Sequence, residues 1–308
     1  MLYSVIIPVY NRPDELRELL HSLSLQNFKD FEVLIIEDGS TNRCNDVVEE
    51  YKEILDIDYY YKVNSGQGYS RNFGFKHAKG DYFVVFDSDC LVPAHYFQAV
   101  SDYLREHEID FWGGPDRAHP DFTTTQKAIN FSMTSILTTG GIRGRKKHLG
   151  NYHPRSFNMG ISREAYEKSG GYRITRMGED IEFSIRLERL GFTSAYIEHA
   201  YVYHKRRTTL SEFFKQLHFF GRARINIGRF YPEEVKPVHW LPLLFSTGLL
   251  FSLLLLLLGI SRLPAAIYII YTVSLFTAGF IREKKVDVAF FGTLAAFIQL
   301  SAYAAGVL

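Results

Sequence analysis

Residues 82–89 read YFVVFDSD, a run of aromatic and β-branched residues followed by two aspartates that flank one serine. Such a run favours a β-strand, so residues 82–86 are predicted to form a strand that ends at Asp87, Ser88 and Asp89. A turn directly after a strand can bring both carboxylates to one point. Paired aspartates are also common in ordinary surface turns, so the weight of this motif depends on what surrounds it.

The chain before this motif repeats one pattern three times. Apolar runs at residues 4–9, 31–36 and 57–62 predict strands, and the segments that follow them show helical spacing of leucine and other apolar residues. Strands that alternate with helices indicate an α/β fold with a mostly parallel sheet covered on both faces.

Polar residues follow two of these strands, Tyr10 and Asn11 after the first and Glu37 and Asp38 after the second. Ligands of such sheets bind beyond the carboxyl ends of the strands. Together with Asp87 and Asp89, these clusters predict a binding site at one edge of the sheet. Mg²⁺ and Mn²⁺ prefer carboxylate and phosphate oxygens, so we expect one of these ions here, with a nucleotide diphosphate as its other partner.

Composition narrows the class of protein. The 308 residues carry a formal net charge of +1, with 22% charged and 46% hydrophobic residues, which argues against disorder and gives no indication of nucleic-acid binding. Cys44 and Cys90 are the only cysteines and form no metal-binding pattern, so both are predicted to be free thiols. The residues before the first strand show no signal-peptide pattern, so we expect the N-terminal domain to be cytosolic.

The last third of the chain is apolar. Residues 240–260, 263–281 and 288–308 contain no charged residue, and each run is about as long as a membrane span. Buried helices of a soluble protein are the alternative. The basic loop at 282–285 should face the cytosol, which predicts a multi-pass inner-membrane protein with a cytoplasmic catalytic domain, three spans and an external C-terminus.

Several motifs in the order found here resemble family 2 glycosyltransferases of the GT-A fold, over about 210 residues. The matching stretches are VIIPVYN at 5–11, EDGST at 37–41, residues 66–78, GDY at 80–82, DSD at 87–89, NMGISR at 158–163, GGY at 170–172 and GED at 178–180. The resemblance implies a GT-A domain at 1–210, an interfacial amphipathic helix or linker at 211–239 and a transmembrane region at 240–308.

The resemblance also implies roles for individual residues. The positions implied to bind the nucleotide sugar are Pro8, Tyr10, Asn11, Asp38, Arg71, Asp87 and Ser88. Asp89 would be the principal metal ligand, with Asp87 and in some relatives a histidine at the place of His204. An aspartate at position 38 could accept the imide N–H of uracil, so a UDP-sugar is favoured.

The same resemblance makes Asp180 the candidate general base and Glu179 a residue that orients the acceptor. Favourable placement at a helix N-terminus is the alternative for both. Arg206 and Arg207 would contact diphosphate, or instead anionic lipid headgroups. The basic run at 143–148 could close over the phosphates or remain solvated.

The expected activity is therefore inverting transfer of a sugar from a nucleotide-diphosphate sugar to a membrane-associated or lipid-linked glycan acceptor, in the synthesis of surface polysaccharide or glycoconjugate. A non-catalytic module that binds nucleotide sugars at the membrane is the alternative. A nucleotidyltransferase would share the sheet, but it normally has a glycine-rich phosphate loop, which residues 8–12 do not form.

Overall fold

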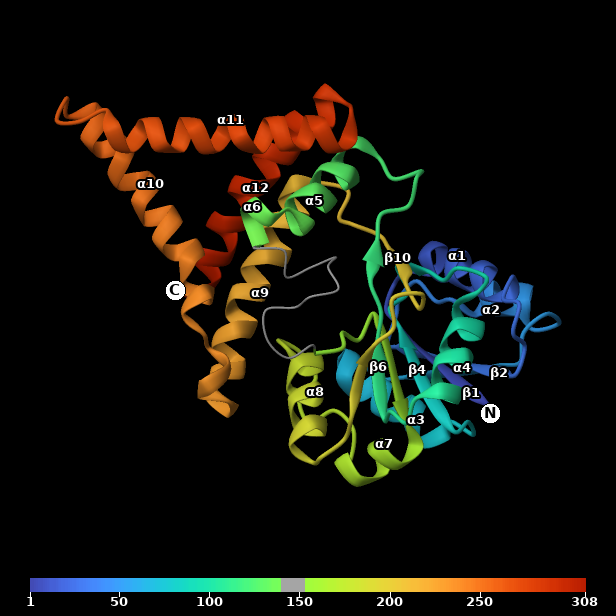
Figure 1. Cartoon of the computed structure of the whole chain (residues 1–308). Helices are drawn as coiled ribbons and strands as arrows, with labels where there is room; N and C mark the ends of the chain where they lie inside the picture. The colour runs from blue at the N-terminus through green and yellow to red at the C-terminus, as the bar shows by residue number, and fades with distance from the viewer. Residues whose placement is uncertain (140–152) are drawn as a thin grey trace. The chain divides into compact units, whose positions relative to one another are not determined.

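The computed structural model describes residues 1–139 and 153–308 (Figure 1). They group into two compact units, one of residues 1–117 and 153–204 and one of residues 118–139 and 205–308. The basic run at 143–148 lies outside the described residues. The domain boundaries at 210 and 239 remain predictions, and residues 118–139 belong to the C-terminal unit by their contacts.

The first unit contains a seven-stranded sheet with strand order β3-β2-β1-β4-β8-β6-β9. Strands β1 to β4 are parallel to one another, and β8 pairs antiparallel with both β4 and β6. The mostly parallel α/β architecture is therefore confirmed. The strands are β1 (Tyr3–Val9), β2 (Phe31–Asp38), β3 (Ile57–Lys62), β4 (Tyr82–Phe86), β6 (Phe111–Gly113), β8 (Asn158–Ser162) and β9 (Ser194–Tyr196).

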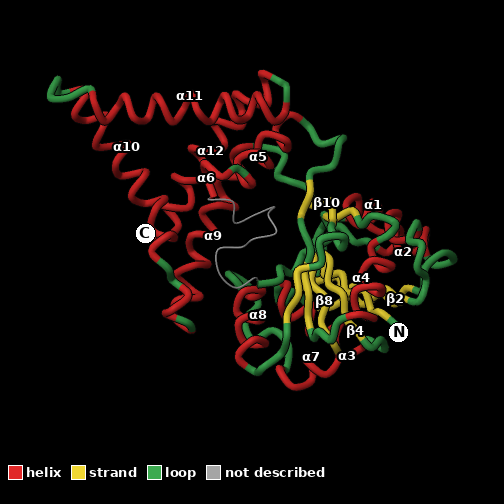
Figure 2. Tube along the Cα trace, in the orientation of Figure 1, coloured by secondary structure: helices red, strands yellow, loops and turns green. Residues whose placement is uncertain are grey.

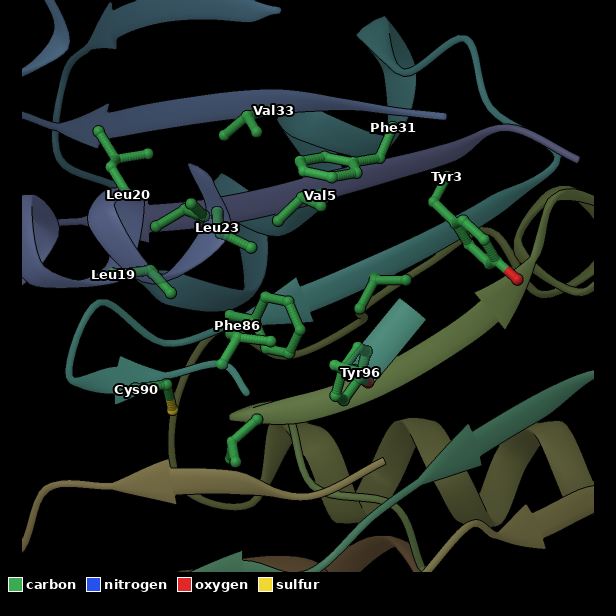
Figure 3. Packing of buried hydrophobic residues seen from close by; sticks show 14 of the residues in the cluster. Tyr3, Val5, Leu19, Leu20, Leu23, Phe31, Val33, Phe86, Cys90 and Tyr96 are labelled. Carbon is green, nitrogen blue, oxygen red and sulfur yellow. The ribbon is translucent and has the colours of Figure 1, made fainter. Parts of the chain in front are cut away.

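Side chains of the central strands alternate between two buried clusters, one on each face of the sheet, because successive residues of a strand point to opposite faces. Val5 and Ile7 belong to one cluster, whereas Ile6 belongs to the other. Figure 3 shows part of the first cluster, in which Val5 and Phe86 of the sheet lie near leucines of the first helix. The continuous apolar runs in the sequence follow from this burial on both faces.

Helices cover both faces of this sheet. Residues of α1, α2 and α4 pack in the first cluster, and residues of α3, α7 and α8 pack in the second. Their bounds are α1 (Pro13–Ser24), α2 (Asn45–Tyr51), α3 (Gln67–His77), α4 (Tyr96–Glu106), α7 (Arg163–Ser169) and α8 (Glu179–Arg189).

A small second sheet has the order β5-β10-β7, with β5 (Cys90–Leu91), β7 (Asp116–Arg117) and β10 (Val202–His204). Strand β10 runs antiparallel to β5, and this register places His204 opposite Cys90. The pairing joins the end of the unit to the residues directly after the Asp87-Ser88-Asp89 turn. Cys44 and Cys90 are both free, as predicted, and both are buried.

Two predicted elements differ in length. The helical segment after the second strand is short, with α2 ending at Tyr51, and strand β2 continues past its predicted end at residue 36 to Asp38. Glu37 and Asp38 extend the strand because they pair with Tyr61 and Lys62 of β3. Their buried carboxylates have partners, which removes the cost that makes charged residues rare inside sheets.

The second unit is helical (Figure 2). Besides two short 3₁₀ helices at Pro232–Glu234 and Pro237–Trp240, it contains α5 (Thr124–Thr134), α6 (Ile136–Thr139), α9 (Leu210–Phe230), α10 (Leu241–Leu257), α11 (Leu263–Glu283) and α12 (Val286–Val307). Three of its helical segments, Pro237–Leu257, Leu263–Glu283 and Val286–Val307, are long and apolar enough to cross a membrane. The number of crossings and the orientation remain predictions.

Candidate active site

The carboxylate of Asp38 holds together the loop that follows β3. It accepts hydrogen bonds from the Lys62 ammonium group and from the backbone N–H groups of Ser65 (2.8 Å) and Gly66 (2.9 Å). Burial acts to raise the pKa of Asp38, but these bonds more than offset it and the pKa is lowered. Asp38 is therefore an ionised, ordered acceptor at the end of β2, and its contact with a nucleotide base remains a prediction.

Asn11 joins the ends of β1 and β2. Its backbone has a positive φ of 55°, a conformation that asparagine tolerates better than most residues. Its side-chain oxygen accepts from the N–H groups of Thr41 (2.8 Å) and Asn42 (2.9 Å), and its own N–H donates to Ser40 Oγ. The structure thus gives Asn11 a scaffold role beside the predicted donor site.

The neighbours of Asn11 differ in exposure. Tyr10 is about half exposed, at 51%, so its ring presents an accessible face at the end of β1. Pro8 is partly buried and lies opposite Ile36 in the sheet. Both residues lie at the edge where the nucleotide was predicted to bind, and neither role is tested.

Arg71 connects the Asp87 turn with the start of α8. Its guanidinium group donates to Asp87 Oδ1 at 2.8 Å and to Glu179 Oε1 at 3.0 Å, and only 1% of the residue is exposed. Gln67, one turn earlier on α3, also donates to the Glu179 carboxylate. Residues separated by about one hundred positions in the sequence therefore form one ion-pair network around the buried Arg71.

The guanidinium group of Arg71 stays protonated although it is buried. Burial alone lowers the pKa of Arg71, but Asp87, Tyr172 and Glu179 outweigh it and the pKa is raised. Burial, together with the neighbouring Asp180 carboxylate, raises the pKa of Glu179, while Arg71 and Gln67 act in the opposite direction. The contact of Arg71 with the nucleotide base or phosphates stays a prediction. The contact of Glu179 with an acceptor also stays a prediction. Their observed partners give them positioning roles.

Asp89 lies beside His204, the histidine that the sequence placed among possible metal ligands. His204 Nε2 is 3.1 Å from Asp89 Oδ1, and Arg12 Nη1 approaches Asp89 Oδ2 at 3.4 Å. The His204 ring stacks on Phe157, with centroids 4.6 Å apart. Strand pairing between β10 and β5 brings these residues together although they are 115 positions apart.

A divalent cation fits this group of side chains. One ligand atom from each of Asp89, Cys90 and His204 lies within 4.8 Å of the others. Burial, aided by Asp89 and Asp87, raises the pKa of the Cys90 thiol well above its ordinary value, and sulfur is a softer ligand than Mg²⁺ or Mn²⁺ prefers. The buried Nδ1 of His204 has no hydrogen-bond partner among the described residues. A carboxylate and an imidazole are therefore the available ligands, with Asp87 two residues away and Ser88 buried in the turn between them.

Asp180 is the second residue of α8 and follows Glu179, which pairs with Arg71. Its Oδ1 accepts from the Ile181 N–H at 2.8 Å, and Arg155 Nη1 lies 3.8 Å from its Oδ2. The side chain is 19% exposed, compared with 4% for Glu179. Of the two acids, Asp180 is the more accessible to solvent.

Arg206 and Arg207 belong to the second unit. Arg206 is buried, and its guanidinium group donates twice to Asn130 Oδ1, at 3.2 and 3.0 Å. Arg207 is partly buried. Neither residue is placed relative to the predicted diphosphate site, so their proposed phosphate contacts remain predictions.

Sequence reasoning missed three residues of the site. Lys62 contacts Asp38, Gln67 contacts Glu179, and Arg12 contacts Asp89. Gln67 lies one turn before Arg71 on the same helix, so i, i+4 spacing could have identified it. Lys62 and Arg12 lie at the ends of elements beside predicted site residues, and only the pairing of β2 with β3 brings Lys62 to Asp38.

Comparison with protein families gives one match that covers more than half of the chain. The model described as Glycosyl transferase family 2 matches residues 4–170. This range includes Asp38, Arg71 and the Asp87-Ser88-Asp89 turn.

Individual relatives match shorter ranges. The uncharacterized glycosyltransferase EpsJ of Bacillus subtilis is 26% identical over 185 residues, which cover 59% of this chain and 53% of that protein. The poly(ribitol-phosphate) beta-N-acetylglucosaminyltransferase TarS of Staphylococcus aureus is 34% identical over 114 residues, 36% of this chain and 20% of TarS. An uncharacterized glycosyltransferase of Rickettsia felis is 38% identical over 108 residues, 35% of this chain and 18% of that protein. The matches thus span between 18% and 53% of the length of these relatives.

Two solved structures share the fold. Residues 1–349 of S. aureus TarS in complex with UDP-GlcNAc align with a TM-score of 0.53 at 21% identity, covering 73% of this chain and 67% of that one. The mannosyltransferase PcManGT of Pyrobaculum calidifontis, in complex with GDP-Man and Mn²⁺, aligns with a TM-score of 0.67 at 16% identity, covering 97% and 85%. The expected GT-A fold is confirmed.

Proposed function

Because the chain belongs to glycosyl transferase family 2, we propose that it transfers a sugar, with inversion, from a nucleotide-diphosphate sugar to a membrane-associated or lipid-linked glycan acceptor. The observation that carries the proposal is the gathering of acids at the carboxyl ends of the strands. Asp38 is the last residue of β2, and Asp87 and Asp89 follow β4. Arg71 links Asp87 to Glu179, the residue before Asp180. A UDP-sugar is favoured by the ionised Asp38, which can accept the imide N–H of uracil.

A metal ion belongs to this proposal. Asp89 and His204, with Asp87, would hold Mn²⁺ or Mg²⁺, and PcManGT binds GDP-Man together with Mn²⁺. When bound, the ion neutralises charge on the departing diphosphate. Arg71 fixes the Asp87 carboxylate in place, and a ligand held in advance loses little conformational freedom when it binds.

Asp180 would act as the general base. The acceptor hydroxyl oxygen attacks the anomeric carbon, its proton passes to the Asp180 carboxylate, and the bond from the anomeric carbon to the phosphate oxygen breaks to release the nucleotide diphosphate. The bond between the Ile181 N–H and Asp180 Oδ1 orients the carboxylate. Oδ2 lies toward Arg155 at 3.8 Å, a distance that leaves it able to accept a proton.

The acceptor proposal rests on the apolar helices of the second unit. Three helices are long and apolar enough to cross a membrane, which supports membrane association. The basic residues of the loop between α11 and α12 favour the cytosolic side of an inner membrane for that loop. A catalytic unit on that side would meet a lipid-linked acceptor at the bilayer surface.

The test is a panel of nucleotide sugars with Mn²⁺ or Mg²⁺ and the detergent-solubilised full chain, read as released nucleotide diphosphate. We expect Asp180→Asn to reduce turnover by about 10²-fold or more, the range of a lost general base. Asp89→Asn should reduce turnover by a similar factor, because it weakens the metal site. His204→Ala should instead raise the Mn²⁺ concentration for half-maximal rate by about tenfold, a loss of about 1.4 kcal/mol in binding.

Two control variants match these changes. Asp102→Asn alters an exposed aspartate that pairs with Arg105, and His199→Ala alters an exposed histidine. Both should turn over like the unsubstituted protein. Full activity of Asp89→Asn or Asp180→Asn would refute the assigned roles, and no turnover of any donor would leave a non-catalytic binding module as the function.

A further inference from the structure

The 172–178 segment lies between α7 and α8 and ends directly before Glu179 and Asp180. These seven residues form neither helix nor strand, so contacts with their surroundings determine the path of the chain. The contacts all lie within the first unit. Because Asp180 is the proposed general base, whatever fixes this segment also fixes the carboxylate that would take the acceptor proton.

The first residue of the segment is anchored to α3. The backbone N–H of Tyr172 donates to Asn72 Oδ1 at 2.8 Å, and Asn72 Nδ2 donates to Tyr172 O at 2.7 Å. Gly171 permits this approach, since a Cβ there would lie 2.3 Å from Asn72 Oδ1. One side-chain amide thus satisfies both backbone polar groups of Tyr172 and holds the chain beside α3.

The middle of the segment contacts the loop between β3 and α3. Thr175 Oγ1 donates to Ser65 O at 2.9 Å, and Thr175 O accepts from the Gly68 N–H at 3.2 Å. A Cβ on Gly66 would lie 2.3 Å from Thr175 Oγ1, and one on Gly68 would lie 2.9 Å from Thr175 Cα, so both glycines are needed for this approach. Thr175 is therefore bound to the loop through its side chain and its backbone.

Ser65 connects this contact to the predicted nucleotide end of the site. Its N–H donates to Asp38 Oδ1 at 2.8 Å, and its carbonyl oxygen accepts from the Thr175 hydroxyl. The following N–H, that of Gly66, donates to Asp38 Oδ2. Two hydrogen bonds through one residue therefore join Asp38 to the 172–178 segment.

The end of the segment turns sharply into α8. Met177 and Gly178 both have a positive φ, 62° and 91°. A residue other than glycine adopts this conformation at a cost and keeps it only where the surroundings hold it. Directly after the turn, Glu179 pairs with Arg71 of α3. Contacts on both sides of the turn therefore place the first turn of α8, which carries Asp180.

We propose that Thr175 is a positioning residue that couples the nucleotide end of the site to Asp180. A nucleotide on Asp38 holds the loop 63–66 closed, and the bond from Thr175 to Ser65 O transmits this order to the first turn of α8. Opening of that turn then requires opening of the loop, which a bound nucleotide opposes. The inference rests on the proposed function, because it needs both the donor site at Asp38 and the general base.

The test compares two variants of one residue. Thr175→Val keeps the shape of the side chain and removes the hydroxyl donor, whereas Thr175→Ser keeps the donor. Amide hydrogen exchange of residues 179–182, read by mass spectrometry on the detergent-solubilised full chain, measures the opening of the first turn of α8. The probe is the tightest-binding of UDP, GDP and dTDP, with Mn²⁺, at about 100 times its dissociation constant.

We expect the nucleotide to slow this exchange by at least about tenfold in the unsubstituted protein and in Thr175→Ser, but by less than about threefold in Thr175→Val. The physical reason is that, without the hydroxyl, the first turn of α8 opens while the loop stays closed on the nucleotide.

Kinetics separate this role from a merely structural one. Thr175→Val should lower kcat about fivefold, the effect of one lost neutral hydrogen bond. KM for the donor should stay within about twofold, because Asp38 keeps its own partners. Thr208→Val is the matched control, since it removes the bond from an exposed hydroxyl to Glu212 Oε2 at 3.2 Å, and it should behave like the unsubstituted protein.

Equal slowing of exchange in Thr175→Val and the unsubstituted protein would overturn the coupling. A lower unfolding midpoint of Thr175→Val with unchanged kcat and exchange would also overturn it, because the hydroxyl would then be only structural. A nucleotide that binds the unsubstituted protein without slowing exchange would overturn the coupling and leave the donor site intact. No binding of any of the three nucleotides would instead refute the proposed donor site, and the coupling with it.

Discussion

Arg71 illustrates how one buried side chain can organise a site. Its guanidinium group satisfies a carboxylate on the turn after β4 and another on the first turn of α8. Arginine suits this task because its planar fork donates in two directions and stays charged when buried. An arginine on α3 would be interpreted from sequence alone as a ligand contact or a surface residue, and its burial shows that it supports other site residues.

Replacing Arg71 tests this network. We expect Arg71→Met to lower the free energy of unfolding by about 3–5 kcal/mol, because it leaves the buried Glu179 carboxylate without its cation. Thermal unfolding in detergent measures the effect. Arg71→Met combined with Glu179→Gln should recover part of the loss, whereas Arg105→Met, at an exposed arginine, should change little. Equal unfolding midpoints for the single and double variants would contradict the pairing.

The lowered pKa of Asp38 predicts that the stability of the folded protein depends on pH. Its pKa is lowered in the folded state, since the bonds from Lys62, Ser65 and Gly66 outweigh the opposing effect of burial. A carboxyl group with a lowered folded pKa binds fewer protons when folded than when unfolded. Its contribution to stability is therefore fully present above the unfolded pKa of about 4 and is lost as the pH falls through the folded value.

We therefore expect the unfolding midpoint of the unsubstituted protein to fall more steeply below about pH 4 than that of Asp38→Asn. Thermal unfolding in detergent between neutral and acid pH gives both profiles. Lys62→Met should move the steep region toward higher pH, because it removes one of the bonds that lower the pKa. Parallel profiles for Asp38→Asn and the unsubstituted protein would exclude this role of Asp38.

At the scale of elements, the sheet depends on a close approach between β8 and Trp112 of β6. A Cβ on Gly160 would lie 2.0 Å from the Trp112 ring, which is fully buried. We expect Gly160→Ala to destabilise the first unit by about 1–3 kcal/mol, the usual cost of overpacking a core, measured by thermal unfolding.

Gly170 provides the contrast. It also needs a glycine, because its φ is +74°, but nothing lies within 4 Å of a Cβ built there. Gly170→Ala should therefore cost about 1 kcal/mol, from backbone strain alone. A larger loss from Gly170→Ala than from Gly160→Ala would show that the Trp112 contact can relax.

At the scale of the whole molecule, ligand binding should stabilise the first unit. The chain has two tryptophans, Trp112 buried in the first unit and Trp240 in the second. In a Trp240→Phe variant, intrinsic fluorescence reports only the first unit. Ligand at about 100 times its dissociation constant adds about 2.7 kcal/mol, which corresponds to a rise of roughly 5–11 °C in the midpoint for a unit of this size.

We expect this rise with UDP and Mn²⁺ together, and a much smaller one with UDP alone. The same measurement with GDP or dTDP decides which base is preferred. Asp89→Asn should abolish the effect of Mn²⁺ while Asp102→Asn should retain it. An unchanged midpoint with every nucleotide would contradict the donor site.

Local sequence determined a large part of this protein. The apolar runs predicted β1, β3 and β4 to within one residue, because a strand buried on both faces needs consecutive apolar residues. The acids at 87 and 89 follow β4 as expected, and the three uncharged runs near the C-terminus are helices long enough to cross a membrane. These features depend on spacing within a few residues, which sequence displays directly.

Only the tertiary structure decided what these residues touch. The pairing of β10 with β5 brings His204 to Asp89, and the packing of α3 against α8 buries Glu179 on Arg71. The packing of α12 against α5, α9, α10 and α11 buries 56% of the apolar window of the third run. Such contacts join residues far apart in the sequence, and a local pattern of apolar residues is the same whether protein or lipid covers it.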